Sequence, residues 1–195
     1  MALAPARRRG AQAGAWPYLI LGIAALAALV LLWMGRSPIC ACGTVKLWYG
    51  DAAGSGTSQH LADWYTPSHI AHGFIFYALL HLAAPRLGLW PRAAIATLAE
   101  AAWEVAENTP AIIQRYREAT IALGYDGDSV INSMADIGWM WLGFWLASRL
   151  PVGASVAIVL AMEIFVGWMI RDNLTLNVLM LLWPLPGVKA WQAGG

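Results

Sequence analysis

The hydrophobic positions of this chain gather into five long runs separated by short polar or proline-containing segments. These runs cover about residues 17–34, 67–84, 92–108, 129–148 and 152–170. Each run is long enough to cross roughly 30 Å of hydrocarbon as a helix. Residues 174–185 are also apolar but too short for a comfortable crossing. The pattern therefore predicts an all-α fold, a polytopic membrane helix bundle with five transmembrane helices plus a short sixth or re-entrant helix.

Composition between these runs predicts a loop and one further helix. Residues 35–66 are rich in glycine and small polar residues, which favours a mobile, solvated loop in which His60 and Asp63 face water. In residues 110–123, apolar side chains recur at helical spacing opposite Arg115 and Arg117. This periodicity predicts an interfacial helix on the membrane surface. The whole chain, 1–195, is interpreted as a single membrane domain.

The overall composition is typical of a membrane protein and argues against nucleic acid as a binding partner. Of the 195 residues, 59% are hydrophobic and 12% are charged, and the mean hydropathy is +0.57. A water-soluble domain carries about 25% charged residues. Trp16 and Trp33 bracket the first run, as indole rings favour the headgroup boundary. Because the net charge is only +1, no basic surface indicates nucleic acid. Membrane lipids are the expected partners, and the sequence identifies no protein partner.

The distribution of basic residues predicts a cytoplasmic N-terminus. Lysine and arginine favour the cytoplasmic side of a membrane. This orientation places seven of the 12 basic residues there, namely Arg7, Arg8, Arg9, Arg86, Arg92, Arg149 and, given a sixth crossing, Lys189. The first run is long enough to span and has no clear cleavage site, so it is predicted to be an uncleaved anchor and not a signal peptide. Residues 1–16 then form a cytoplasmic tail and residues 35–66 a periplasmic loop.

Acids, histidines and asparagines gather at the outer ends of four predicted helices. Glu100, Glu104 and Asn108 repeat every four residues and so share one face of their helix. Asp128 and Asp136 share a face of the next helix in the same way. At a rise of 1.5 Å per residue, the deepest of these acids would lie roughly 10–12 Å below the helix ends. Ionisable groups at that depth usually face one another or a wet cavity, so we expect one hydrated pocket beneath the periplasmic face.

This cluster supplies the candidate functional residues. The candidate catalytic residues are Glu104, Asp128, Asp136 and His72. The candidate ligand-binding residues are His69, Glu100, Glu107, Asn108, Asn132, Arg171, Asp172 and Asn173. Such groups can transfer protons, and carboxylates with histidines can bind a divalent cation. No spacing matches a named metal motif, so the cofactor is unknown and a divalent cation stays one open alternative.

A polar network that only packs helices together explains part of the same pattern. Hydrogen bonds within a membrane contribute about 0.6–2 kcal/mol each to helix association. Asn132 and Asn173 fit that role at least as well as a functional one. Acids are a costly way to join helices, which favours function for Glu104. Glu163 has an alternative partner in Arg171, farther along its own helix.

Two cysteines, Cys40 and Cys42, follow the first run with one residue between them. A disulfide across that gap requires extended backbone, and two thiolates alone fall short of a structural zinc site. The pair is therefore interpreted as two small residues at a membrane boundary.

Five long strings carry a resemblance to one protein family. They are Leu-Trp-Met-Gly (32–35), Val-Lys-Leu-Trp (45–48), Ala-Asp-Trp-Tyr-Thr-Pro-Ser-His-Ile (62–70), Glu-Ala-Ala-Trp-Glu-Val (100–105) and Arg-Asp-Asn-Leu-Thr-Leu-Asn-Val-Leu-Met-Leu-Leu-Trp-Pro (171–184). Almost the whole chain from Trp33 onward resembles an uncharacterised family of alphaproteobacterial multi-pass membrane proteins. The resemblance implies a location in the bacterial cell inner membrane and carries no assigned activity.

A second, partial resemblance is to VanZ-like membrane proteins. Their pattern has a histidine opening one helix, Glu-x-x-Gln in the next and Asp-x-x-x-Asn in the third. Here His72, Glu104 and the Asp128/Asn132 pair are similar to those positions, while Glu107 stands where glutamine is usual. The resemblance implies the helix arrangement only.

Three functions fit these observations. The first is an outward-facing membrane site that handles an envelope lipid or its polar headgroup, whether or not it catalyses a reaction. The second is a proton- or ion-coupled carrier, against which stands the lack of comparable polar residues in the inner half of the bundle and of inverted repeats. The third is a structural or assembly protein whose polar network fixes helix packing.

Overall fold

A computed structural model describes residues 7–120 and 124–194 of the chain, and these described residues form helices, turns and loops without a strand. The all-α prediction is confirmed. The helices are α1 (Arg7–Trp33), α2 (Thr66–Ala83), α3 (Leu89–Glu107), α4 (Pro110–Ala119), α5 (Val130–Arg149), α6 (Val152–Ile170), α7 (Leu174–Leu182) and α8 (Pro186–Gln192).

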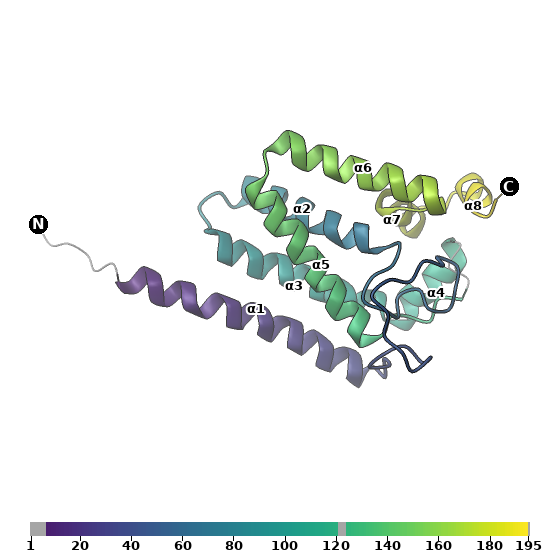
Figure 1. Ribbon diagram of the computed structural model, residues 1–195, viewed down its shortest axis with the longest axis horizontal. Helices are drawn as coiled ribbons and strands as arrows, with labels where there is room; N and C mark the ends of the chain where they lie inside the picture. Colours follow the sequence, from purple (N-terminus) through teal and green to yellow (C-terminus); the bar gives the residue numbers. More distant parts are fainter. Residues whose placement is uncertain (1–6, 121–123, 195) are drawn as a thin grey trace, which may run out of the picture.

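Three helices, α2, α3 and α5, form the centre of the molecule (Figure 1). α1 runs beside α3 and projects beyond the rest at its N-terminal end. α6 packs on α2, and α4, α7 and α8 gather at the end of the bundle opposite the start of α1 (Figure 1). The loop between α1 and α2 lies at the same end as α4, so several loops and helix ends meet there.

The closest helix contact is between α2 and α5, where two glycines let the backbones touch. A Cβ atom added at Gly73 would lie 2.1 Å from the backbone oxygen of Met140. One added at Gly143 would lie 2.0 Å from the backbone oxygen of Ile70. Real Cβ atoms do not approach other atoms so closely, so both positions require glycine. Small residues at such contacts are characteristic of helix pairs in membranes.

Two helices are long and apolar enough to cross a membrane by length and composition. They are the segment Gly14–Trp33 of α1 and the whole of α6. Side chains of α6 such as Ile164 and Trp168 are largely exposed, as expected for a helix that faces lipid. α3 fails the same criterion because it carries Arg92 and three glutamates. The two apolar helices support membrane association, and five crossings stay a prediction.

The C-terminal part divides into two short helices. α7 has 9 residues and α8 has 7. At 1.5 Å per residue, α7 is roughly 13 Å long, which is less than half of a bilayer's hydrocarbon thickness. Residues 174–185 therefore contain a short helix, as predicted. The predicted interfacial helix, 110–123, corresponds to α4, and residues 121–123 lie outside the described residues.

The loop between α1 and α2 differs from its prediction. His60 and Asp63 are only 1% and 4% exposed, so the interpretation that they face water is wrong. Asp63 accepts hydrogen bonds from the backbone N–H groups of Ser58 (2.7 Å) and Tyr65 (2.8 Å). These bonds tie the loop to the start of α2. Burial raises the pKa of Asp63, and the two bonds only partly oppose that rise.

The interpretation of the cysteines as two unpaired small residues is also wrong. Cys40 and Cys42 form a disulfide, with Cα atoms 5.1 Å apart. Cys40 is buried, and the backbone N–H of Cys42 donates to its sulfur. The bond closes a tight turn within the loop.

Candidate functional site

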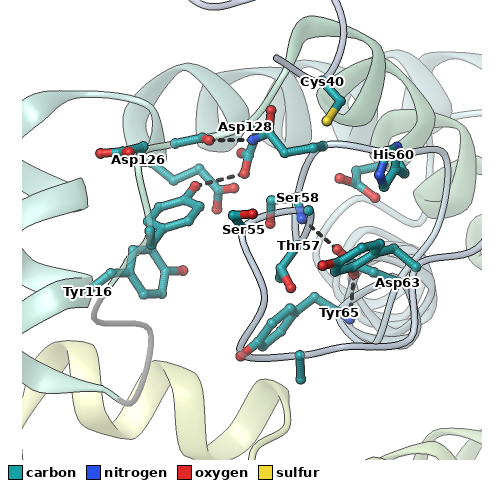
Figure 2. Close-up of a pocket in the computed structure, with 18 of the residues that line it drawn as sticks. Cys40, Ser55, Thr57, Ser58, His60, Asp63, Tyr65, Tyr116, Asp126 and Asp128 are labelled. Atoms are coloured by element: carbon teal, nitrogen blue, oxygen red, sulfur yellow. Dashed lines mark hydrogen bonds between the residues drawn. The ribbon is translucent and has the colours of Figure 1, made fainter. Parts of the chain in front are cut away.

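A cavity of about 1060 Å³ lies where the loop, α2, α3 and the turn before α5 meet. Figure 2 shows its loop side, with Cys40 and His60 on one side and Tyr116 and Asp126 on the other. Backbone and hydroxyl groups of residues 54–58 form part of the wall. The acids and histidines predicted from the sequence that line it are His69, His72, Glu107, Asp128 and Asp136.

Glu100 holds both histidines of α2. Its carboxylate accepts hydrogen bonds from Nδ1 of His69 (2.8 Å) and from Nδ1 of His72 (3.0 Å). An ionised carboxylate only accepts, so both rings donate from Nδ1. In the neutral form of each ring, Nε2 is then the unprotonated nitrogen. Glu100 is fully buried, and every one of its oxygens has a partner.

Glu104, one turn farther along α3, has the same burial and no such partners. Its side chain is 0% exposed, and neither carboxylate oxygen has a hydrogen-bond partner among the described residues. Nδ1 of His69 lies 3.5 Å from Oε1 of Glu104, but this nitrogen already donates to Glu100. On the other side of the same ring, Nε2 lies 3.8 Å from Oδ2 of Asp136. His69 thus lies between acids of α3 and α5.

Asp128, by contrast, is fully partnered. It accepts from the side-chain amide of Asn108 (2.8 Å) and from the Tyr125 hydroxyl (2.8 Å), and its backbone N–H donates to the Asn108 side-chain oxygen (2.7 Å). Burial, and then the charge of Asp128, raise the pKa of the Tyr125 phenol well above its ordinary value. Tyr125 therefore remains a hydrogen-bond donor at neutral pH. Glu107 lies close by, with one carboxylate oxygen each from Glu104, Glu107 and Asp128 within 4.8 Å of the others.

Asn132 belongs to the packing of the loop. Its side-chain amide donates to the backbone oxygen of His60 (2.8 Å). Its backbone N–H bonds the Ser129 hydroxyl, which caps α5. These bonds hold the loop against the start of α5.

The three C-terminal candidates form a separate network that does not line the cavity. Arg171 ends α6 in the left-handed conformation, with φ 56°, and donates to the backbone of Trp191. The Asn173 side chain caps α7 by accepting from the backbone N–H of Leu176. Asp172 accepts from the hydroxyl of Tyr65 (3.1 Å), which connects this network to the start of α2.

Glu163 belongs to the same network and does not pair with Arg171. Its carboxylate accepts from the backbone N–H groups of Leu174 (3.1 Å) and Thr175 (2.9 Å), at the start of α7. Acids suit this position because the first N–H groups of a helix have no partner within it.

The central cluster holds far more acid than base. Five carboxyl groups lie within it, and its two histidines are the bases that contact them. Among the described residues, no lysine or arginine forms a salt bridge with any of the five. The five acids are Glu100, Glu104, Glu107, Asp128 and Asp136.

Residues that the sequence prediction missed also face the cavity. His60 and Asp63 come from the loop between α1 and α2. Tyr65 stands directly before α2, and Tyr125 lies in the turn before α5. Tyr125 stands in the turn Gly-Tyr-Asp-Gly directly before Asp128, which was a usable signal. The sequence contained no comparable signal for His60 and Asp63, because their burial depends on contacts between distant parts of the chain.

These features define an all-helical protein with a buried acid–histidine cluster at the floor of a cavity, and with two helices able to cross a membrane. The family model for "Protein of unknown function (DUF2585)" matches residues 31–194. The chain belongs to this family, as the resemblance predicted. No solved structure matches it. The comparisons give no support to the VanZ-like resemblance.

Similar proteins come from several alphaproteobacteria. A UPF0314 protein of Paracoccus denitrificans is 64% identical over 168 residues, which cover 86% of this chain and 87% of the relative. The UPF0314 protein R03235 of Rhizobium meliloti is 57% identical, with 94% and 93% covered. A UPF0314 protein of Sphingopyxis alaskensis is 53% identical, with 89% and 92% covered.

Proposed function

We propose that this protein is a multi-pass inner-membrane protein whose outward-facing site binds the polar headgroup of an envelope lipid and acts on it. One observation carries the proposal. Acids and histidines from three helices, far apart in the sequence, lie together at the floor of one cavity of about 1060 Å³. Small-molecule pockets measure about 300–1,000 Å³, so the cavity has room for a headgroup.

The lengths and outer faces of the helices support five crossings. α2, α3 and α5 have 18, 19 and 20 residues, which corresponds to roughly 27–30 Å each. Their polar groups turn toward one another, while Leu79, Leu98 and Trp145 are exposed on their outer surfaces. A bundle with this arrangement hides its acids from lipid.

The disulfide in the loop supports a periplasmic position for the cavity. Disulfides persist in the bacterial periplasm and are rare in the reducing cytosol. The Cys40–Cys42 bond lies in the loop that walls the cavity. The distribution of lysine and arginine along the chain predicts the same orientation, with the N-terminus in the cytoplasm.

His72 is the residue best placed to accept a proton from a bound headgroup. It is partly exposed, lines the cavity and donates from Nδ1 to Glu100. A histidine held by a carboxylate in this way has a free Nε2 and a fixed ring, which is what a general base needs. Asp136 also lines the cavity and would face the polar end of the same ligand, and Asp128 holds the Tyr125 hydroxyl beside it.

The test is the lipid composition of a deletion strain. Deletion of the gene should accumulate or deplete one class of envelope lipid, and expression of the wild-type protein should restore it. His72→Gln should fail to restore the profile, since loss of a general base lowers a rate by about 10²–10⁴-fold. His81→Gln is the matched control, because His81 lies on the same helix and contacts Arg92 away from the cavity. An unchanged lipid profile in the deletion strain would overturn the proposal.

A packing role competes with this proposal for some residues. The bonds of Asn132 to the loop and of Asn173 to α7 are structural contacts. If the cluster as a whole only packed helices, Glu104→Gln and Asp136→Asn would lower thermal stability in detergent, while the protein that survives kept its function. A functional site gives the opposite result, folded protein without activity.

A further inference from the structure

Glu104 is the most unusual group in the molecule because it combines complete burial with an absence of hydrogen bonds. Its side chain is 0% exposed, and both carboxylate oxygens lack a partner among the described residues. A buried, unpartnered carboxylate is strongly unfavourable. Some group must therefore compensate it, either a proton or a cation.

The arrangement around His69 favours a cation. Nδ1 of His69 donates to Glu100, so Nε2 carries the lone pair when the ring is neutral. That nitrogen lies 3.8 Å from Oδ2 of Asp136. A lone pair on Nε2 and a carboxylate oxygen repel each other, and either a proton on Nε2 or a metal cation bound by both atoms would relieve that repulsion.

The contact of His69 with Glu100 has the form found around protein metal sites. Histidines that bind metals usually donate their other ring nitrogen to a carboxylate, which fixes the tautomer and the ring orientation. Glu100 provides this carboxylate at 2.8 Å. One ligand atom from each of His69, Glu104 and Asp136 lies within 4.8 Å of the others, which suits ligands of a common ion.

We propose that a divalent transition-metal ion, Zn²⁺ or Mn²⁺, binds between His69, Glu104 and Asp136 at the floor of the cavity. Glu100 is a positioning residue that orients His69. One imidazole and two carboxylates form a mixed nitrogen and oxygen donor set, which suits these ions better than Mg²⁺ or Ca²⁺. His69 and Asp136 also line the cavity, so the ion would be open to a ligand from that side.

This inference rests on the proposed function and sharpens its substrate class. A cation at the floor would coordinate an anionic oxygen, so the preferred ligand is a lipid with a phosphate-bearing headgroup. The acids would otherwise repel such a headgroup. The ion therefore explains how a cavity with five carboxyl groups at its base could hold an anionic ligand.

A second group of metal-type ligands, Cys40, Cys42 and His60, does not compete. Its two sulfurs are bonded to each other. Nδ1 of His60 accepts from the backbone N–H of Lys46 (3.3 Å), which leaves the proton on Nε2. Neither the thiolates nor a free ring nitrogen is available while these bonds exist. Cys42→Ser is therefore expected to leave metal binding at Glu104 unchanged.

The test uses the full-length protein in detergent micelles, stripped of metal by a chelator and then titrated with Zn²⁺ or Mn²⁺ by calorimetry. The wild-type protein should bind Zn²⁺, and Glu104→Gln should weaken binding at least 100-fold. Glu100→Gln should weaken it about 10–100-fold, as expected for a residue that acts through a ligand. Glu118→Gln is the matched control, because Glu118 is exposed on α4, and it should bind as the wild type does.

Circular dichroism and melting curves show whether each variant folds. If Glu104→Gln does not fold, Asp136→Asn replaces it, and the visible spectrum of Co²⁺ bound to the wild type decides between protein ligands and the hydrated ion. Absence of Zn²⁺ and Mn²⁺ binding, equal affinity in folded Glu104→Gln, or a hydrated-ion spectrum would each overturn the inference. If His72→Gln still alters the lipid profile in that case, the headgroup function stands and only the metal is wrong.

Discussion

Two polar regions of this molecule satisfy their acids in different ways. In the C-terminal network, Glu163 accepts two backbone N–H groups at the start of α7, and Asp172 accepts from Tyr65 and Gln192. In the central cluster, Glu100 is equally well bonded, but Glu104 has no hydrogen bond. The acids of the C-terminal network therefore have a structural role, because they join the start of α7 to α6 and the C-terminal helix to the start of α2.

The difference teaches how to separate packing from function in a helix bundle. An acid whose oxygens all meet donors from its own chain needs nothing else to be stable. An acid that is buried without donors needs a proton or a ligand, and its place in the fold is unexplained without one. Glu104 is therefore the residue on which the functional interpretation depends most.

The largest expected effect comes from separating α2 and α5, whose contact positions His69 and Asp136 of the central cluster. Gly143→Ala places a methyl group against the backbone of Ile70, so the helices must move apart, at a cost of about 3 kcal/mol. The free energy of unfolding in detergent should fall accordingly. Gly138→Ala, on the same helix with no atom within 4 Å, should instead be neutral or stabilising by up to about 1 kcal/mol. Equal melting temperatures for the two variants would contradict the close contact.

The C-terminal network should make stability depend on pH through Asp172. Burial raises the pKa of Asp172 from 3.8 to about 6. The folded state then holds the proton more tightly than the unfolded chain does. The contribution of this group to stability is therefore fully present below about pH 4 and is lost as the pH rises to about 6, a change of about 3 kcal/mol. Unfolding at several pH values should give a shallower slope between about pH 4 and 6 in Asp172→Asn than in the wild type, because Asp63, whose pKa is also raised, titrates in both proteins.

Two glutamates on one helix face should respond to methionine with opposite signs. In the metal-free protein, Glu104→Met removes an unpartnered carboxylate and should raise the free energy of unfolding by about 1–3 kcal/mol. Glu100→Met leaves the Nδ1 donors of His69 and His72 without an acceptor and should lower it by a similar amount. Thermal melts after chelation measure both. A loss of stability in both variants would mean that Glu104 has bonds that the structure does not contain.

The smallest effect should come from the cap of α7. Glu163→Gln weakens the bonds to the N–H groups of Leu174 and Thr175 and should lower stability by about 1 kcal/mol. Because Glu163 lies outside the cavity, the variant should still restore the lipid profile of a deletion strain. If the folded Glu163→Gln variant failed to restore the lipid profile, the C-terminal network would have a functional role as well, and the distinction between the two regions would be wrong.

The sequence was informative about the central cluster for a physical reason. Glu100 and Glu104 are one helical turn apart, so they share a face, and the cost of burying them requires that face to meet polar groups. His69 and Asp136 meet that face in the structure. The pairing of each acid could not be predicted, because it depends on where α2 and α5 cross. That crossing is fixed by Gly73 and Gly143, whose contact joins distant parts of the chain.

The loop and the C-terminal network lay beyond prediction for a related reason. Glycine and small polar residues indicated a solvated loop, yet the bonds of Asp63 to Ser58 and Tyr65 bury it. Composition does not report such bonds. The turn at Arg171 has a left-handed backbone that residues other than glycine rarely adopt, so no local signal placed α7 beneath Glu163.

The contact between the backbones of α2 and α5 gives the site a fixed base beneath a cover made by the loop. His69 lies one turn from Gly73, and Asp136 lies two turns from Gly143, so their separation is set by a junction that admits no side chain. The junction does not hold the loop and the turn above, which form the rest of the cavity wall. Any adjustment of the cavity to the size of a ligand would therefore fall to those two segments, while the spacing of His69 and Asp136 stays constant.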